Sequence, residues 1–177
     1  IYILHKIGNC CMSLIVWRIS HKEYTSTALI GEAYNRSRGR WNSKGTTLMY
    51  TSATLSLAAL ETLVYMEIEN FSNIFVSISI KIPDSFPIKQ VDESLLPHNW
   101  RNTPPPKILT SIGDRWFTSK TTAVLKVPSA ILPQEYNYLI NPLHPDFEKI
   151  SIAPPQSFTL YHVSLNTHCG KILRNRE

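Results

Sequence analysis

The sequence has little cysteine and glycine, and it has no long apolar run. Its 177 residues include three cysteines and six glycines. Cys10 and Cys11 are adjacent and Cys169 lies far away, a pattern that makes neither a zinc-ligand spacing nor a disulfide framework. A cytoplasmic, reducing location is therefore expected. No stretch approaches the length of a transmembrane helix, and Ile1–Cys11 makes a poor secretory signal.

Several catalytic motifs are missing as well. The sequence contains no Gly-x-Gly-x-x-Gly after a strand, no Walker loop and no Gly-x-Ser-x-Gly elbow. The histidines are scattered without metal-ligand spacing. A Rossmann dinucleotide site is therefore not expected, and neither a metal nor a resident cofactor is implied.

Length and charge set the remaining limits. A chain of 177 residues with 43% hydrophobic residues is long enough to bury one core. The net charge of +5 points weakly toward an anionic ligand such as a nucleotide, a nucleic acid or an acidic partner. We predict a single domain over residues 13–165. Residues 1–12 are interpreted as an extra N-terminal segment or alternative start, and residues 166–177 as a basic tail.

Short strands and helices alternate irregularly, which favours an α+β fold over a doubly wound sheet. Apolar residues alternate with Ser77, Ser79 and Lys81 along residues 74–82, which predicts a half-buried strand. The proline-rich region 84–106 is predicted to be loop with a brief helix at 93–96. Further strands are predicted at residues 14–17, 46–52, 123–127, 138–140 and 158–163, and a further helix at 107–120.

One central stretch combines a cationic loop, a strand and a helix. Residues 35–45 crowd basic side chains around glycines, and the next strand ends in Thr51 and Ser52, either of which can cap the helix that follows. On a helical wheel Glu61 falls at the edge of the apolar arc of that helix. A carboxylate in such a place is either paired with a loop arginine or is an active-site group in a basic cleft.

Five residues remain as candidates for chemistry, and they suit a nucleotide whose leaving group departs from a ribose. Arginines bind phosphate oxygens in bidentate fashion, a tyrosine ring stacks on a flat base, and a carboxylate stabilises an oxocarbenium-like transition state. A serine hydroxyl can orient a phosphate, a ribose or water, although it also suits a turn or cap. The five are Arg18, Arg40, Tyr50, Glu61 and Ser129.

The same motifs resemble RES-domain proteins, the toxins of Xre–RES toxin–antitoxin pairs, which are named after an arginine, a glutamate and a serine. The resemblance spans Ile15 to Tyr161, with its motifs in the family's order. They are Val16–Ile19, Gly39–Thr46, Tyr50–Ser52, Leu60–Glu61, Leu125–Pro133, Asn137–Pro142 and His144–Phe147.

The resemblance implies an ADP-ribosyltransferase-like mixed sheet with flanking helices. It also implies an enzyme that cleaves the nicotinamide–ribose bond of NAD, with water or inorganic phosphate as acceptor, or with a protein as acceptor in a few relatives. Arg18 and Arg40 would then bind the phosphates, and Tyr50 would stack near nicotinamide. Glu61 would stabilise the ribosyl cation. Ser129 would lie at the pocket floor, and Tyr34 is a weaker candidate for lining it.

Other interpretations stay open at this point. Arg36 and Arg38 could share the phosphate role, leaving Arg40 as the structural partner of Glu61. A phosphate-tracking nucleic-acid module would explain these arginines but gives Glu61 no role. The resemblance further implies an Xre-type helix-turn-helix antitoxin that covers the basic cleft and carries the DNA binding, and a toxin homodimer within the complex is plausible. No membrane partner is expected.

Overall fold

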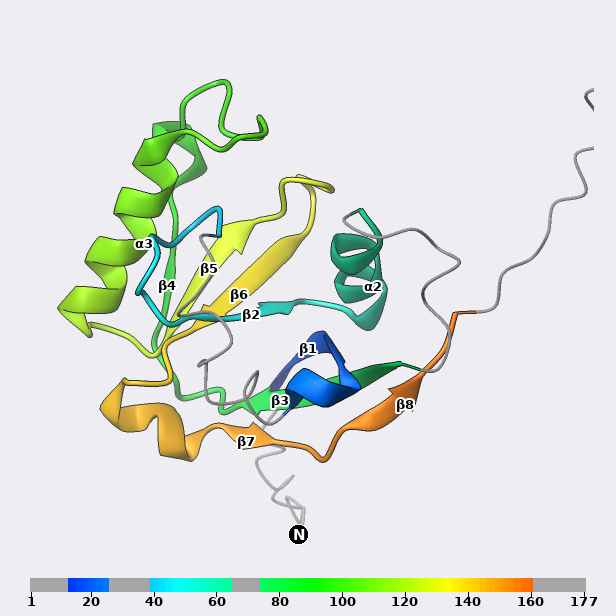
Figure 1. The fold of residues 1–177 in the computed structure, drawn as a ribbon. Helices are drawn as coiled ribbons and strands as arrows, with labels where there is room; N and C mark the ends of the chain where they lie inside the picture. The colour runs from blue at the N-terminus through cyan, green and yellow to red at the C-terminus, as the bar shows by residue number, and fades with distance from the viewer. Residues whose placement is uncertain (1–12, 26–38, 65–73, 161–177) are drawn as a thin grey trace, which may run out of the picture.

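The computed structural model describes residues 13–25, 39–64 and 74–160, and all structural statements refer to them. Eight strands there form one sheet in the order β4-β5-β6-β2-β1-β3-β7, with β8 also paired to β3 (Figure 1). The strands are β1 Leu14–His21, β2 Met49–Ser52, β3 Phe75–Ile82, β4 Ile88–Gln90, β5 Val124–Pro128, β6 Tyr136–Ile140, β7 Ser151–Ile152 and β8 Gln156–Phe158. The helices are α2 Leu55–Leu63 and α3 Lys107–Ser119, with 3-10 turns η1 Lys22–Tyr24, η4 Glu93–Leu95 and η5 Pro145–Lys149.

The sheet consists of two parts that meet at a single register pair. β1 pairs with β3 along its whole length, and β2 pairs with β6 along its whole length. Between the two parts, β1 and β2 pair only at Trp17 and Ser52. Only β4 and β5 run parallel, and all other pairs are antiparallel. The predicted α+β fold with a mixed sheet and flanking helices is confirmed.

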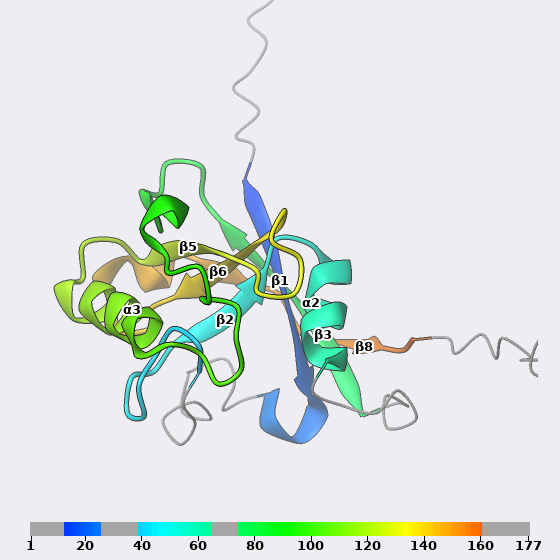
Figure 2. The same cartoon turned by 90° about the horizontal axis from the view of Figure 1, so that it is seen from above.

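The two helices cover the same face of the sheet at separate places. Register pairs place Trp17, Ser52, Asn137 and Val127 side by side on this face. α2 packs its Ala58 against Ile19 of the β1–β3 part. α3 packs on the β5–β6 part, through a cluster that holds Leu109, Trp116, Leu125, Val127 and Leu139. Both views show the two helices set apart from each other (Figures 1 and 2).

The opposite face carries the largest apolar cluster. It combines Met49, Ile78 and Ile140 from three strands, and Phe147 and Ile150 from the η5 segment pack against it. The predicted helix at 107–120, the brief helix near residue 93 and the strand at 74–82 are all present. No helix among the described residues is long and apolar enough to cross a membrane.

Five local predictions need correction. β1 continues to His21, so Arg18 lies inside the strand rather than after it. Thr54, not Thr51 or Ser52, caps α2 by accepting the Leu57 N–H at 3.0 Å. The reason is tertiary: the Thr51 hydroxyl donates to the Tyr138 carbonyl at 2.7 Å, and Ser52 belongs to β2. Ser77 is buried because the α2 layer covers that end of β3.

The other corrections concern the ends of predicted loops and strands. The region 84–106 contains a strand, β4, because residues 88–90 pair with β5. The strand predicted at 158–163 shares only Phe158 with the observed β8, residues 159–160 are not in a strand, and residues 161–163 lie outside the described part. Residues 1–12 and the predicted tail 166–177 also lie outside it.

Candidate active site

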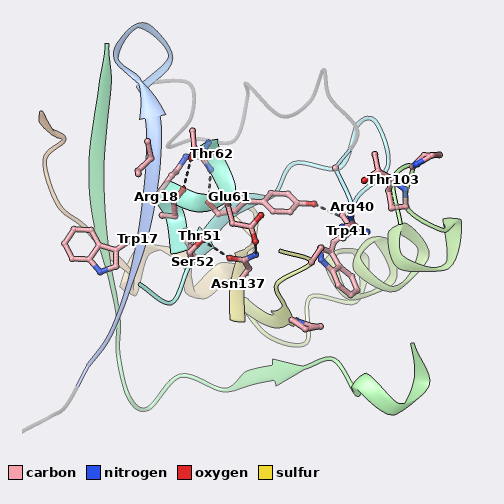
Figure 3. Close-up of a pocket in the computed structure, with 18 residues that line it drawn as sticks. Trp17, Arg18, Arg40, Trp41, Thr51, Ser52, Glu61, Thr62, Thr103 and Asn137 are labelled. Carbon is pink, nitrogen blue, oxygen red and sulfur yellow. Dashed lines mark hydrogen bonds between the residues drawn. The ribbon is translucent and has the colours of Figure 1, made fainter. Parts of the chain in front are cut away.

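A pocket of about 580 Å³ opens where β1 and β2 diverge. This volume lies within the usual range for small-molecule sites. Its walls come from β1, β2, the 39–41 loop, α2, the 103–105 segment and the end of β5. The polar and aromatic residues among its lining are Trp17, Arg18, Arg40, Trp41, Tyr50, Thr51, Ser52, Glu61, Thr62, Thr103 and Asn137 (Figure 3).

Glu61 projects from α2 into this pocket, and two side chains from other elements hold its carboxylate. Ser129 Oγ donates to Glu61 Oε1 at 2.7 Å, and Asn137 Nδ2 donates to the same oxygen at 2.6 Å. Its partners among the described residues are therefore neutral donors and not an arginine. Because both donors use Oε1, the second carboxylate oxygen keeps its lone pairs for a ligand.

Ser129 stands behind Glu61 at the end of β5. The side chain is fully buried, and its oxygen accepts the backbone N–H groups of Ile131 at 3.1 Å and Leu132 at 3.0 Å. The serine therefore caps a turn and holds the glutamate at the same time. The sequence left two interpretations of Ser129, a hydroxyl that orients a ligand and a residue that caps a turn. The structure shows Ser129 in a turn, directly behind the pocket wall.

Arg18 crosses the gap between the two parts of the sheet. Its side chain is buried, with 6% exposed, and Nη1 donates to the Tyr50 carbonyl at 2.8 Å. That carbonyl lies on β2 where backbone pairing to β1 has stopped, so the guanidinium takes the place of a strand partner. Arg18 also lines the pocket and so brings a positive charge to it (Figure 3).

Tyr50 is fixed through its hydroxyl by the loop that precedes β2. The hydroxyl donates to Asn42 Oδ1 at 2.7 Å and accepts the Trp41 N–H at 3.1 Å. A Cβ at Gly39 would lie 2.4 Å from the tyrosine oxygen. Gly39 therefore serves close packing inside the protein. Gly45, at φ +94°, is the glycine of this loop that needs a positive φ.

Arg40 holds the segment that forms another wall of the pocket. Its guanidinium donates to the carbonyls of Trp100 at 2.6 Å, Asn102 at 3.2 Å and Arg101 at 3.3 Å. Arg101 Nε in turn donates to the Ala130 carbonyl at 2.8 Å. We call residues 100–105 the strap, since it joins the 39–41 loop to the turn after β5. The alternative in which Arg40 pairs with Glu61 is wrong, because these carbonyls occupy the guanidinium.

The structure thus brings Arg18, Arg40, Tyr50 and Glu61 to one pocket, with Ser129 behind it. Tyr34, Arg36 and Arg38 lie outside the described residues. Trp41 is a packing anchor, with 2% exposed in the α3 cluster, and Lys44 is exposed. No group of three or more metal-ligating side chains gathers within the described ranges.

Sequence reasoning missed Asn137 and Ser52, which both line the pocket. Asn137 belongs to one of the motifs quoted for the resemblance, but no role was assigned to it. A usable signal is its position two residues before Leu139 in a strand whose face is otherwise apolar.

Close by on β6, burial raises the pKa of Tyr138, and a hydrogen bond to Glu93 raises the pKa of Tyr136, so both phenols are neutral near pH 7.

The comparisons with known proteins agree with this geometry. Residues 15–161 match the family described as the RES domain. The chain belongs to the RES-domain family. It is 35% identical to a protein named Toxin Res from Yersinia enterocolitica, over 82% of this chain and 95% of that protein. It is 34% identical to a protein named Prs ADP-ribosylating toxin from a Sphingobium species, over 78% of this chain and 89% of that protein.

One solved structure has a fold similar to that of this RES-domain chain. The crystal structure of the M. tuberculosis MbcT–MbcA toxin–antitoxin complex aligns with a TM-score of 0.66 at 13% identity. The alignment covers 84% of this chain and 86% of that chain. At this identity the likeness shows the fold, and the function has to be argued from the site.

Proposed function

We propose that this RES-domain protein is a toxin that depletes NAD by cleaving the nicotinamide–ribose bond. The observation that carries the proposal is the Glu61 carboxylate, oriented by Ser129 and Asn137 toward a pocket that also holds Arg18. A carboxylate with one oxygen fixed and the other directed at a ligand suits a reaction in which positive charge develops on a sugar.

The chemistry follows from the charges. The bond between ribose C1′ and the nicotinamide nitrogen breaks, and its electron pair stays on nicotinamide, which leaves as a neutral molecule. Positive charge develops on the ribose, and Glu61 stabilises it. Water then attacks C1′ and loses a proton, giving ADP-ribose, or inorganic phosphate attacks and gives the 1-phosphate. Tyr50, locked through its hydroxyl, offers its ring face for stacking beside nicotinamide.

The arginines are assigned to the phosphates of NAD. Arg18 lines the pocket, and a guanidinium has the planar fork that matches phosphate oxygens. Arg40 also lines the pocket, but its guanidinium is shared with the carbonyls of the strap. We therefore propose that Arg40 holds the pocket wall that faces the phosphates. Ser129 acts through Glu61. No resident cofactor or metal takes part in this scheme, and phosphate enters only as a co-substrate.

Transfer of ADP-ribose to a protein is the second candidate. The name of the Sphingobium relative favours it, since that protein is called an ADP-ribosylating toxin. The bond that breaks is the same, and only the acceptor differs. A nucleic-acid module is not favoured, because Arg40 is held by backbone carbonyls and the module gives Glu61 no role.

A toxin of this kind needs a partner that silences it. We propose an antitoxin of the Xre type that covers the pocket, in line with the antitoxin present in the M. tuberculosis complex. DNA binding would then belong to the antitoxin, and the toxin would act in the cytoplasm. A homodimer of toxins within the complex is part of the same proposal.

The test is proton NMR of NAD incubated with the purified protein, with and without inorganic phosphate. Free nicotinamide should appear with the wild type. Glu61→Gln keeps the volume but removes the negative charge, so the rate should fall about 100- to 1000-fold, as for loss of one preorganised charge-stabilising group. Dependence on phosphate would identify phosphorolysis, and its absence would identify hydrolysis.

Two outcomes would contradict the proposal. If the folded, antitoxin-free wild type leaves NAD intact, simple NAD destruction is wrong, and labelled NAD should next be tested with protein acceptors. If Glu61→Gln releases nicotinamide as fast as the wild type, the carboxylate is not part of the chemistry. Thermal unfolding of both proteins checks that the variant is folded.

A further inference from the structure

We propose that Asn137 is a positioning residue for the Glu61 carboxylate, and that Ser52 fixes the direction in which its amide points. The inference rests on the proposed function, since it names groups that orient the same carboxylate. Ser52, Asn137 and Glu61 come from β2, β6 and α2, and they follow one another along the pocket wall (Figure 3).

The first step is the orientation of the amide. Ser52 Oγ hydrogen-bonds Asn137 Oδ1 at 2.7 Å. An amide oxygen can only accept, so the serine hydroxyl is the donor. With the oxygen engaged by Ser52, the amide nitrogen faces the other way and donates to Glu61 Oε1 at 2.6 Å. The serine thereby determines that Asn137 presents a donor to the glutamate.

The second step concerns the other donor. Ser129 has a single hydroxyl proton, and its oxygen already accepts the N–H groups of Ile131 and Leu132. A hydroxyl with both acceptor positions occupied can only donate to a further partner. Its proton therefore goes to Glu61 Oε1, at 2.7 Å. Two obligatory donors thus meet on one carboxylate oxygen.

The third step is what this does to the carboxylate. Oε1 receives two hydrogen bonds, so the carboxylate cannot rotate away without losing both of them. Oε2 is thereby held on the side of the carboxylate away from Ser129 and Asn137. The donors come from the ends of β5 and from β6, on the far side of the pocket from β1. The pair of donors therefore sets the angle at which Glu61 meets a ligand.

The test compares the same substitution at Asn137, which is partly buried and lines the pocket, and at a fully buried asparagine elsewhere. Asn137→Asp keeps the acceptor for Ser52 and replaces the donor to Glu61 by an oxygen. At pH 8 we expect kcat for nicotinamide release to fall about 100-fold, the cost of a misplaced catalytic group, with KM nearly unchanged. Asn141→Asp is the control, because Asn141 is fully buried but serves Phe117 and Leu143. That variant should lose thermal stability and keep its kcat.

A second readout separates positioning from mere structure. If Asn137 acts through Glu61, Asn137→Asp should cost almost nothing further in a Glu61→Gln background, since coupled residues are not additive. The deficit of Asn137→Asp should also shrink as the pH falls, because two adjacent carboxyl groups then share a proton and one donates again. Arg18 and Arg40 are the other charged side chains that line this pocket among the described residues.

Each outcome decides the question. Two results would overturn the inference and leave NAD cleavage intact. In the first, Asn137→Asp lowers kcat no more than Asn141→Asp does. In the second, Asn137→Asp lowers kcat by the same factor in the Glu61→Gln background as in the wild type. Absence of nicotinamide release by the wild type would overturn the proposed function and this inference together. If Asn137→Asp does not fold, Ser52→Ala replaces it: it should lower kcat with the same dependence on Glu61, and an unchanged kcat would overturn the inference.

Discussion

Gly39 determines where the ring of Tyr50 lies. A methyl group at this position would meet Tyr50 Oη and Asn42 Oδ1, each at 2.4 Å. Gly39→Ala must therefore displace the tyrosine from the pocket wall. On the proposed function, we expect KM for NAD to rise about 10-fold, the equivalent of one lost aromatic stacking contact, with a smaller effect on kcat. Steady-state kinetics with NAD measures both constants.

Gly45→Ala is the matched control in the same loop. Gly45 has φ +94°, and no atom lies within 4 Å of the place a methyl group would take, so the substitution strains the backbone without touching the pocket. It should lower the free energy of unfolding by about 1–2 kcal/mol and leave KM unchanged. An equal rise of KM in both variants would mean that loop stability, and not the position of Tyr50, governs binding.

At the residue scale the sequence predicted the pocket's members better than their partners. Arg18, Arg40, Tyr50 and Glu61 do converge, and Ser129 contacts Glu61. The sequence did not predict that the arginines also bind backbone carbonyls. The Trp100 carbonyl that Arg40 binds lies 60 positions further along the chain. A guanidinium suits a phosphate and a cluster of carbonyls equally well, so residue type alone does not separate the two.

At the scale of elements, α3 contains a glycine where helix propensity favours alanine. Gly113 lies in the middle of α3, and a Cβ there would stand 1.8 Å from the Trp41 carbonyl oxygen. Propensity alone predicts a gain of about 1 kcal/mol for Gly113→Ala. Because the obstacle is backbone, we instead expect overpacking to lower the free energy of unfolding by about 1–3 kcal/mol, measured by urea denaturation.

Ser111→Ala provides the comparison on the exposed side of the same helix. Among the described residues its hydroxyl bonds the Lys107 carbonyl alone, so the substitution should change stability by a few tenths of a kcal/mol at most. Should Gly113→Ala prove more stable than the wild type, α3 does not rest against the Trp41 backbone. The pocket wall formed by the 39–41 loop would then need another support.

Elements with a strong local pattern were predicted well, and those that depend on distant partners were not. β3 and α3 carry their own periodicity, and both are found close to the predicted ends. β4 has only three residues and exists because it pairs with β5. The cap of α2 is Thr54 and not Thr51 or Ser52, because β6 engages the hydroxyls of both β2 residues. No local pattern contains that information.

At the scale of the whole molecule, the site exists because the sheet is divided. β1 and β2 share one register pair, so a gap opens beyond it that ordinary pairing would have closed. The chain fills part of this gap with Arg18 and leaves the rest as the pocket. Trp17, the residue of β1 at that pair, lies at the pocket's edge (Figure 3). The gap itself was not predictable, because every strand around it reads as an ordinary strand.

Arg18 should therefore contribute to both stability and binding. Arg18→Lys keeps the charge but shortens the reach and loses the planar fork that donates to the Tyr50 carbonyl. The part-buried Tyr50 carbonyl then lacks a donor within reach, so the free energy of unfolding should fall by about 1.5–3 kcal/mol in urea denaturation. The control, Arg115→Lys, changes an exposed arginine whose hydrogen bond within the described residues goes to the Ser111 carbonyl of its own helix, and it should be close to neutral.

The same measurement with ADP-ribose links the two roles of Arg18. A ligand at 100 times its Kd stabilises the folded state by about 2.7 kcal/mol, so the wild type should gain that much at saturating ADP-ribose. If the guanidinium binds both the Tyr50 carbonyl and the ligand phosphates, Arg18→Lys should gain clearly less at the same concentration. An equal gain in both proteins would assign Arg18 to joining the two parts of the sheet and would leave phosphate binding to other residues of the pocket.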